Sequence, residues 1–425
     1  MKDFDLFIKD LATLISFESV YATPEEGKPF GEAVSSALNA FASIAKRLGF
    51  SVTSHDGYLV EVSYGEGEEV GIIGHLDVVP VGIGWNTPPF KLTEKEGIYY
   101  GRGIVDNKSP ILLCLYALNE LKNSGKDSGR KFRLFAGGDE ESGWRDVEYF
   151  NRVGSFPDYG FSPDGNFPLT YAEKGITEIQ FCLDAPKNFY ELSGGTALNA
   201  VCDYAKCKVS KNAINKELLE KYSLKINGDI IESFGKAAHG STPHLGKNAI
   251  LPLLSYMSEV GENYSDAINF IFNDVLGVSK LCTEQGAVTL SPNLLTQEGN
   301  KIYLTCDCRI PYPLTEEDVK AVLDKFKIPY TTKLRHPPMC ASKDGWLVTS
   351  LINAYNEVTG ENAQPIAMGG STFARAFKYG CSFGPSTNGD LECGGLHDAN
   401  EFASKSYLLK CYEIYKKAIF NLAKI

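Results

Sequence analysis

The segment between residues 70 and 141 constrains the fold most, because it has the pattern of a strand, a helix and a second strand. The apolar runs at 70–79 (VGIIGHLDVV) and 132–141 (FRLFAGGDEE) have the length of buried strands, and the segment 111–125 between them has a helical pattern. This alternation predicts an α/β domain. Pro110 suits the first turn of the helix, so Asp106 is expected in the loop that leads into it.

The pattern of predicted strands and helices changes after about residue 174, and the earlier pattern returns near residue 342. Two amphipathic helices at 4–15 and 34–48 open the chain, and helical patterns return at 344–360 and in the final segment. Between them lie strand patterns at 175–183, 301–311 and 330–334 and helical patterns at 248–261 and 315–326, the latter opened by Thr315 with Asp318 three residues on. We therefore expect a discontinuous domain formed by residues 1–174 and 342–425, with an α+β domain of residues 175–341 inserted into it.

Composition excludes several classes of function. The 425-residue chain has a net charge of −11, which gives no basic surface for nucleic acid, and it has no run of about 20 apolar residues that would span a membrane. The charged first residues do not resemble a signal peptide. Eleven cysteines without a CxxC motif predict reduced thiols, among them Cys306 and Cys308 on one core strand face. A cytoplasmic protein that acts on small molecules or peptides is expected.

Histidine and carboxylate residues follow apolar or glycine-rich segments at several places in the first domain. They are His75 and Asp77 in GHLDVVP, Asp106 in GRGIVDNKSP, Glu140 and Glu141 in GGDEESG, Asp164 in FSPDG, and His397 in GGLHDANEF. Each motif alone has an ordinary explanation as a turn, a helix cap, or a core or surface histidine. Together they supply the imidazole and carboxylate ligands that two neighbouring divalent ions need, and they predict a two-metal hydrolase site.

Two of these motifs suggest distinct roles for adjacent residues. His75 can bind a metal through one ring nitrogen while Asp77, two residues on in an extended chain, accepts a hydrogen bond from the other. Glu140 and Glu141 are neighbours, so one is expected to bind metal and the other to meet the water or the substrate.

The chain resembles the di-zinc metallopeptidase family that includes aminoacylases, glutamate carboxypeptidases, succinyl-diaminopimelate desuccinylase and carnosinase-like bacterial dipeptidases. The resemblance is closest to the bacterial dipeptidases and rests on motifs found in the same order from about residue 5 to the C-terminus. These motifs are HLDVVPVGIGW, GRGIVDNKSP, GGDEESGW, FSPDGNFP with EKG, GKAAHGSTPHLGKNAI, GGSTFAR and SFGP. The resemblance implies a zinc-exopeptidase-like α/β domain with a central mixed sheet flanked by helices, and an inserted α+β lid.

The resemblance also implies roles for single residues. His75 and Asp164 would bind one metal, Glu141 and His397 the other, and Asp106 would bridge them, with Asp77 orienting His75. Glu140 would be the general base that takes a proton from the metal-bridging water and passes it to the leaving amine. In the inserted domain, His239 would donate to the oxyanion and Arg309 would hold the substrate's carboxylate. Asn199, and backbone groups around Gly369, Gly370 and Ser371, would also contact the substrate.

The sequence departs from the family pattern at two positions. Relatives commonly have Asp-Asp-Lys-Gly where this chain has Asp-Asn-Lys-Ser at residues 106–109, and a glycine where Ser371 stands. The change at Asn107 leaves the bridging Asp106 intact but affects the fine geometry around it. The inserted domain is larger than the dimerising lid of most relatives, so a monomer is expected in which His239 closes over the metals of its own chain.

Three functions remain compatible with these observations. The first is a metal-dependent dipeptidase, and the second is an amidohydrolase that removes an acyl group from an amino acid or a succinyl-diaminopimelate-type substrate. The third is a metal-binding protein that has lost catalysis. Imidazole and carboxylate ligands favour zinc, with manganese or cobalt as alternatives.

Overall fold

The computed structural model describes residues 1, 3–126, 128–386 and 392–423, which form two compact units. The first unit consists of Met1–Tyr171, Cys340–Ile366 and Thr372–Ile425, and the second of Ala172–Met339 and Ala367–Ser371. Each unit has its own sheet and its own hydrophobic core.

The helices of the first unit are α1 (Phe4–Ile15), α2 (Glu32–Arg47), α3 (Lys108–Asn123), α4 (Arg145–Val153), the short 3₁₀ helix η5 (Phe373–Ala376), α9 (Trp346–Thr359) and α10 (Lys405–Leu422). Its main strands are β1 (Ser51–His55), β2 (Leu59–Tyr64), β3 (Glu68–His75), β6 (Arg130–Gly137), β7 (Tyr159–Ser162) and β22 (Tyr379–Ser382). Smaller strands are β4 (Thr93–Lys95), β5 (Ile98–Tyr100), β8 (Gly165–Asn166), β23 (Pro385–Ser386), β24 (Cys393–Gly394) and β25 (Phe402–Ser404). The chain passes between the two units in β9 (Thr170–Glu173), β20 (Met339–Cys340) and β21 (Ile366–Met368).

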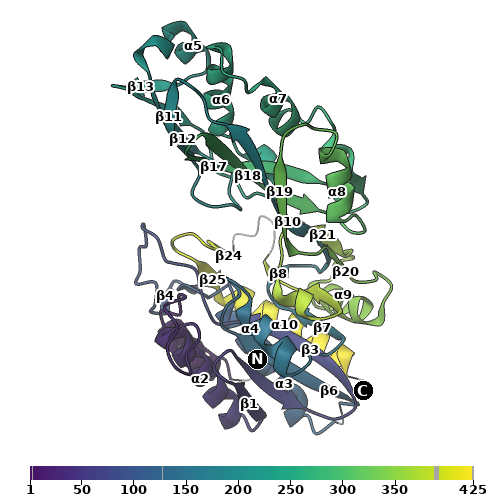
Figure 1. Ribbon diagram of the computed structural model, residues 1–425. Helices are drawn as coiled ribbons and strands as arrows, with labels where there is room; N and C mark the ends of the chain where they lie inside the picture. Colours follow the sequence, from purple (N-terminus) through teal and green to yellow (C-terminus); the bar gives the residue numbers. More distant parts are fainter. Residues whose placement is uncertain (2, 127, 387–391, 424–425) are drawn as a thin grey trace. The chain divides into compact units, whose positions relative to one another are not determined.

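The main sheet is mixed, with strand order β1-β2-β6-β3-β7-β22-β9-β20 and β21 paired with β9. The four central strands β6, β3, β7 and β22 are parallel, β2 pairs antiparallel with β6, and β1 pairs antiparallel with β2. Figure 1 labels β1, β3, β6 and β7 of this sheet. Both faces of the sheet are covered: a Cβ at Gly74 of β3 would lie 3.1 Å from Ile111 of α3, whereas one at Gly71 would lie 2.1 Å from Phe377 beside η5. The predicted mixed sheet flanked by helices is confirmed.

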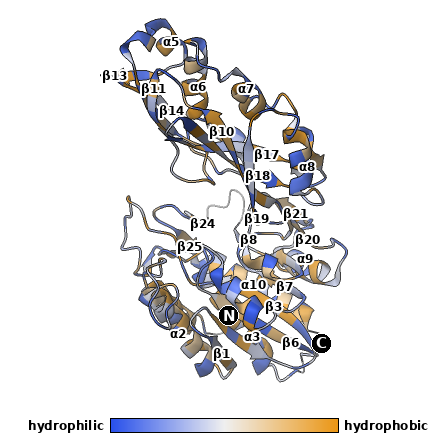
Figure 2. Cartoon of the chain, viewed as in Figure 1, coloured by the Kyte–Doolittle hydropathy of each residue, from blue (hydrophilic) through white to orange (hydrophobic). Residues whose placement is uncertain are grey.

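The central strands are apolar because helices cover both of their faces. From Val70 to His75 every residue of β3 is buried, and β6 is buried from Phe132 to Gly137. Figure 2 shows hydrophobic residues gathered along these strands. α3 packs against β3 and α10, and most of its residues are buried, so it has little amphipathic character. The short runs between 70 and 141 therefore formed the strands and the helix that their pattern predicts.

The second unit is built around an antiparallel sheet of order β13-β14-β12-β11-β17-β18-β10-β19. Its strands are β10 (Gly175–Asp184), β11 (Phe189–Gly194), β12 (Tyr204–Val209), β13 (Lys225–Asn227), β14 (Ile230–Phe234), β17 (Thr289–Glu298), β18 (Lys301–Ile310) and β19 (Tyr330–His336), with a separate pair β15 (Cys282–Thr283) and β16 (Gly286–Ala287). Its helices are α5 (Lys216–Lys221), α6 (Ile250–Glu259), α7 (Ser265–Ala267) and α8 (Glu316–Leu323), with short turns η1 (Lys211–Ala213), η2 (Pro243–Leu245), η3 (Ile268–Phe272) and η4 (Val278–Lys280).

Local signals in the second unit behave as the sequence predicts. The predicted capping box is present at the start of α8, where Thr315 and Asp318 cap each other's backbone. Cys306 and Cys308 of β18 are fully buried in the core, and all eleven cysteines are free thiols. The α+β character of this region is confirmed. Within the part of the chain that the structure describes, no helix is long and apolar enough to cross a membrane.

Candidate metal centre

Three parallel strands bring their carboxyl ends together beside one another and place four of the predicted residues there. His75 is the last residue of β3, Glu140 and Glu141 follow the end of β6, and Asp164 follows the end of β7. Because β3 lies between β6 and β7 in the sheet, the loops after the three strands meet at the same edge. The order of the strands thus assembles residues that lie up to 89 positions apart in sequence.

Asp106 and His397 complete the cluster from two loops. Asp106 lies just before α3, and its Oδ1 is 3.0 Å from Nε2 of His75 while its Oδ2 is 3.0 Å from Nε2 of His397. His397 Nε2 also lies 3.1 Å from Oε1 of Glu141. The backbone of His397 has a φ of 62°, a left-handed conformation that is uncommon for residues other than glycine and is often found at functional sites. Asp106 therefore lies between the two histidines.

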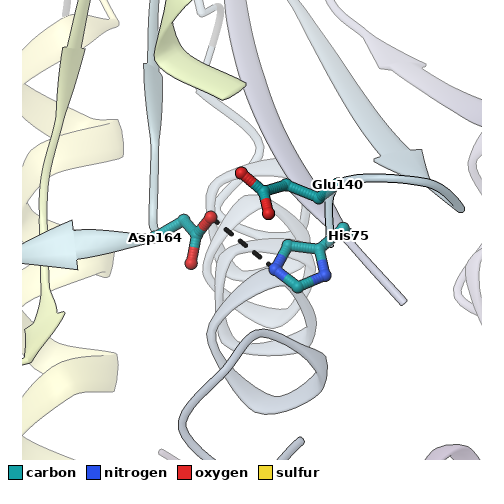
Figure 3. Close-up of side chains that lie close together, drawn as sticks. All are labelled: His75, Glu140 and Asp164. Carbon is teal, nitrogen blue, oxygen red and sulfur yellow. Dashed lines mark ion pairs between the residues drawn. The ribbon is translucent and has the colours of Figure 1, made fainter. Parts of the chain in front are cut away.

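Two overlapping sets of side chains in this cluster have a geometry that could hold a metal ion. His75, Glu140 and Asp164 form one set and His75, Asp106 and Glu141 the other, with the ligand atoms of each set within 4.8 Å of one another. Figure 3 shows Glu140, Asp164 and the ring of His75 directed toward a shared space, with Oδ2 of Asp164 3.6 Å from Nε2 of His75. All six predicted residues of the first unit that were assigned to metal or base lie in this cluster.

The carboxylates of the cluster are close enough to disfavour one another's ionisation. Burial raises the pKa of Glu140 well above its usual value, and the charge of Asp164 adds to the effect. Burial likewise raises the pKa of Asp164 to about 7, although the neighbouring His75 opposes this. The pKa of Glu141 is raised by burial and by the charge of Asp106. Positive charge is needed to hold these groups together as carboxylates.

The two histidines are correspondingly held in their charged form. Burial alone would lower the pKa of His75, but the charge of Asp164 and a hydrogen bond with Asp106 raise it well above the usual value. Hydrogen bonds with Asp106 and Glu141 raise the pKa of His397 to about 11. Burial opposes ionisation of Asp106, yet its hydrogen bonds with both histidines lower its pKa. This surplus of carboxylates around imidazole nitrogens is the donor set that divalent ions require, and the residues present fit such ions.

Asp77 contacts Nδ1 of His75 through its backbone carbonyl and its carboxylate. Nδ1 of His75 lies 3.0 Å from the backbone carbonyl of Asp77 and 3.4 Å from its carboxylate, so the carbonyl is the nearer acceptor. The Asp77 carboxylate also accepts the backbone N–H groups of Glu140 at 3.2 Å and Glu141 at 3.0 Å.

A carbonyl oxygen can only accept a hydrogen bond, so Nδ1 of His75 carries a hydrogen and donates it. In the neutral ring, the lone pair then lies on Nε2, which faces Asp106 and Asp164. Asp77 thus fixes the orientation of His75 through its carbonyl, and the loop of Glu140 and Glu141 through its carboxylate.

Sequence reasoning did not assign a structural role to Asn107, although it noted the departure there. The side chain is fully buried, and its Oδ1 accepts the backbone N–H of His75 at 3.3 Å. Its Nδ2 donates to the carbonyl of Pro163 at 2.5 Å and to Oδ1 of Asp164 at 3.3 Å. Asn107 therefore joins the segments that carry Asp106, His75 and Asp164.

Other buried polar residues beside the cluster were also missed. Asp146 is fully buried in the first turn of α4 and accepts the N–H groups of Gly138 at 2.8 Å and Asp139 at 3.1 Å, just before Glu140. Glu401 and Arg102 form a buried ion pair at 3.0 Å. The sequence gives no signal for these partners, because each depends on a contact that only the folded chain creates.

The predicted residues of the second unit form a separate group of contacts. The carbonyl of Asn199 accepts the N–H of Gly240 at 2.7 Å, which follows His239. Arg309 donates through Nε and Nη2 to the two carboxylate oxygens of Asp307 at 2.8 Å each, and through Nη1 to the carbonyl of Gly369 at 3.0 Å. A Cβ at Gly240 would lie 2.3 Å from the Asp307 carboxylate, so the loop of His239 presses directly on this ion pair.

The segment of Gly369, Gly370 and Ser371 belongs to the same group. A Cβ at Gly369 would lie 2.5 Å from the side chain of Ser241, two residues after His239. Nδ1 of His239 lies 2.7 Å from Oγ of Ser241 and accepts the Ser241 backbone N–H at 3.2 Å. The residues that sequence reasoning selected in this unit are therefore neighbours of one another.

The fold and the cluster together define a class: a mixed α/β domain whose parallel strands present, at their carboxyl ends, side chains that could hold divalent ions. Residues 71–421 match Peptidase family M20/M25/M40, and the chain belongs to this family. The predicted resemblance to metal-dependent peptidases is confirmed.

Relatives along the full length are named as dipeptidases. The chain is 30% identical to "Putative dipeptidase YtjP" of Bacillus subtilis, covering 98% of this chain and 97% of that protein. It is 31% identical to "Beta-Ala-Xaa dipeptidase" of Lactobacillus delbrueckii subsp. lactis, covering 99% and 96%. The resemblance to the bacterial dipeptidase branch is thereby confirmed.

Solved structures share the fold at low sequence identity. Human carnosine dipeptidase 1 superposes with a TM-score of 0.60 at 16% identity, covering all of this chain and 97% of that one. The dipeptidase Dug1p from Saccharomyces cerevisiae gives a TM-score of 0.61 at 15% identity, covering 100% and 97%. These likenesses confirm the predicted fold class.

Proposed function

We propose that this protein is a metal-dependent dipeptidase that hydrolyses the peptide bond of free dipeptides. The observation that carries the proposal is the cluster at the strand ends, in which Glu140 lies beside a set of imidazole and carboxylate groups suited to two divalent ions. The names of the full-length relatives, among them a β-Ala-Xaa dipeptidase, support dipeptides as the substrate class.

Five residues are proposed as metal ligands. His75 and Asp164 would hold one ion, and Glu141 and His397 the other. Asp106 would be shared, which agrees with the way its two oxygens face the two histidines. The ligand chemistry favours zinc, with manganese or cobalt as alternatives. When bound, the ions lower the pKa of water and polarise the scissile carbonyl.

Glu140 is proposed as the general base and then the general acid. Its carboxylate takes a proton from the attacking water as the new C–O bond forms, and passes that proton to the amine nitrogen as the C–N bond breaks. Burial and the charge of Asp164 raise its pKa, the direction that makes a carboxylate a stronger base. Asp77 supports the role by holding the backbone of Glu140 and Glu141.

The inserted residues 175–341 are proposed as a lid that recognises the substrate, with residues 1–174 and 342–425 as the catalytic domain. His239 would donate to the oxyanion of the tetrahedral intermediate and Arg309 would bind the carboxylate end of the dipeptide. Hydrogen bonds to described residues use three of the five N–H groups of Arg309, which leaves donors for a carboxylate. Asn199 and the Gly369–Ser371 segment would complete this contact surface.

The size of the insert also supports a monomer in which one chain supplies both the metals and His239. Light scattering of the purified protein would then give a mass of 46.6 kDa, and an obligate dimer would contradict this part of the proposal.

The decisive test compares free dipeptides with N-acetyl and N-succinyl amino acids after metal reconstitution. We expect dipeptides to be cleaved. Cleavage of the acylated amino acids instead would favour the alternative, an N-acyl amino acid or succinyl-diaminopimelate-type amidohydrolase. No turnover of any substrate by protein that binds two metals would favour a non-catalytic metal-binding protein.

Variants of the adjacent glutamates separate catalysis from metal binding. Glu140→Gln should bind both metals and lose about 10²–10⁴-fold in kcat, the range that general acid–base groups contribute. Glu141→Gln should lose metal affinity as well. Glu148→Gln is the matched control, because Glu148 is exposed on the helix that follows. Normal turnover by Glu140→Gln would remove Glu140 from the mechanism.

A further inference from the structure

The carboxylate of Glu401 is fully buried and receives four hydrogen-bond donors from a single segment of the chain. Its Oε1 accepts the backbone N–H groups of Val105 at 2.7 Å and Asp106 at 3.1 Å. Its Oε2 accepts the N–H of Gly103 at 2.9 Å and Nη1 of Arg102 at 3.0 Å. These bonds use the accepting capacity of both oxygens, so Glu401 does not itself belong to the metal ligands.

The segment that Glu401 holds has no regular secondary structure of its own. Residues 101–106 connect β5 with α3, and Gly103 has a φ of 91°. Backbone N–H groups buried in such a loop need partners, and without Glu401 three of them would lose theirs. The carboxylate is therefore what gives this loop one defined conformation up to Asp106.

The ion pair of Arg102 and Glu401 also contacts the loop that carries His397. Glu401 lies four residues after His397, and Nη2 of Arg102 donates to the carbonyl of Asp398 at 3.1 Å. The backbone carbonyl of Glu401 accepts the N–H of Gly101 at 3.1 Å, which continues the antiparallel pairing of β25 with β5. Arg102 and Glu401 thus tie the loop of His397 to the loop of Asp106.

We infer that Glu401, with Arg102, is a positioning residue that sets the place of Asp106 relative to His397 and so determines how tightly the centre binds metal. The inference rests on the metal centre of the proposed function. Asp106 must face His75 with one oxygen and His397 with the other, and a small rotation of its backbone would misplace both oxygens. Groups that orient metal ligands typically change metal affinity or activity by 10- to 100-fold when they are removed.

Cobalt binding to Glu401→Gln tests the inference without any substrate. The amide would turn N–H groups toward backbone donors, so we expect Co²⁺ affinity, measured by competition with a chelator, to fall by about 10- to 100-fold and the visible absorption spectrum to change. Arg102→Lys keeps the charge but loses the fork that reaches both Glu401 and Asp398, and should lose affinity to a smaller extent. Glu61→Gln removes a different, largely buried carboxylate–arginine pair and should leave affinity and spectrum unchanged.

Two Co²⁺ ions bound by Glu401→Gln with wild-type affinity and spectrum would overturn the inference. If that variant does not fold at the temperature of the assay, as judged by circular dichroism, Arg102→Lys decides in its place, and unchanged affinity there overturns the inference. A wild-type protein that binds Co²⁺ but cleaves no dipeptide would count against the proposed function alone, because the affinity comparison would still stand.

Discussion

Asn107 shows how one amide can fit a site that a carboxylate would fit only when protonated. Its oxygen faces a donor, the N–H of His75, and its nitrogen faces two acceptors, the Pro163 carbonyl and Asp164. The partners determine the orientation of the amide, since an N–H can only donate and a carbonyl can only accept. An ionised carboxylate at this position would place negative charge against both acceptors.

Asn107→Asp is therefore expected to make the stability of the metal-free protein more dependent on pH. The folded state would favour the protonated form of the new carboxyl group, which raises its pKa above the unfolded value of about 3.9. The variant should match the wild type at low pH and lose stability as pH rises, by about 1.4 kcal/mol per unit of difference between the two pKa values. Urea unfolding at pH 5 and pH 8 would measure the change.

Asn39→Asp on the exposed face of α2 is the matched control for that experiment. It introduces the same charge without a buried partner. If Asn107→Asp differs in stability from the wild type by the same amount at pH 5 and pH 8, the neighbours of residue 107 do not disfavour an ionised carboxylate, and the account based on the hydrogen bonds is contradicted.

His239 is held in a form that suits a hydrogen-bond donor. Its Nδ1 accepts the N–H of Ser241, so in the neutral ring Nε2 carries the hydrogen. If this hydrogen stabilises an oxyanion, His239→Ala should lower kcat by about 10²–10³-fold with a smaller change in KM. His244→Ala, five residues later in the same segment and also exposed, is the control. Equal kinetics of the two variants would contradict the assigned role.

The residues of the metal centre were predictable to the extent that they follow the strands of a parallel sheet. Apolar runs that end in His75 or just before Glu140 locate the strand ends, and neighbouring parallel strands must present those ends at one edge. Turn-like and glycine-rich motifs added Asp106, Asp164 and His397 as candidates, and the family resemblance implied their roles. Asn107 and Glu401 could not be assigned, because their buried partners lie 32 to 299 positions away and depend on how loops pack.

At the scale of elements, strand prediction succeeded for β3 and β6 and for β10, β18 and β19, and it missed other strands, among them a short one and one with an irregular register. The long apolar pattern of β3 and β6 was sufficient to locate them. Strands such as β12 alternate buried and exposed residues over only six positions, and β17 is interrupted by an irregular register next to Pro292. Their existence depends on pairing with distant strands, and the sequence pattern alone did not reveal them.

A charged network links four neighbouring strands of the first sheet, β1, β2, β6 and β3, and makes the stability of the fold sensitive to acid. Glu61 of β2 bonds to Nε of Arg133 of β6 at 2.6 Å and to Nε2 of His55 of β1 at 3.0 Å, and Arg133 also bonds to Glu69 of β3 at 2.9 Å. Burial alone would raise the pKa of Glu61, but the hydrogen bonds and charge of Arg133 and His55 lower it below its usual 4.5.

Because the folded pKa of Glu61 lies below the unfolded value, its contribution to stability is present above about pH 4.5 and is lost as pH falls through the folded pKa. We expect Glu61→Gln to lower the free energy of unfolding by about 1.5–3 kcal/mol at pH 7, the range for hydrogen bonds to charged groups. The difference from the wild type should shrink toward pH 3. A difference independent of pH in denaturant titrations would contradict this account, with Glu18→Gln at an exposed position as the control.

At the scale of the whole molecule, the two units differ in the kind of side chains that they bury. The first unit contains the proposed metal centre with its repelling carboxylates, whereas the antiparallel sheet of the second unit packs around a mostly aliphatic and aromatic core. Metal ions that bind only the folded first unit should therefore stabilise that unit directly. At a free metal concentration 100 times the dissociation constant, the gain is about 2.7 kcal/mol.

The distribution of tryptophan allows this prediction to be tested unit by unit. The three tryptophans, Trp85, Trp144 and Trp346, all lie in the first unit, so tryptophan fluorescence reports its unfolding, whereas far-UV circular dichroism reports both units. Removing metal with a chelator should lower the midpoint of the unfolding transition seen by tryptophan fluorescence. The part of the circular dichroism transition that comes from the second unit should keep its midpoint. If the fluorescence and circular dichroism midpoints shift together, the two units unfold as one cooperative structure. A fluorescence midpoint that does not change with metal would contradict the metal centre, because a ligand bound only by the folded state must raise the stability of that state.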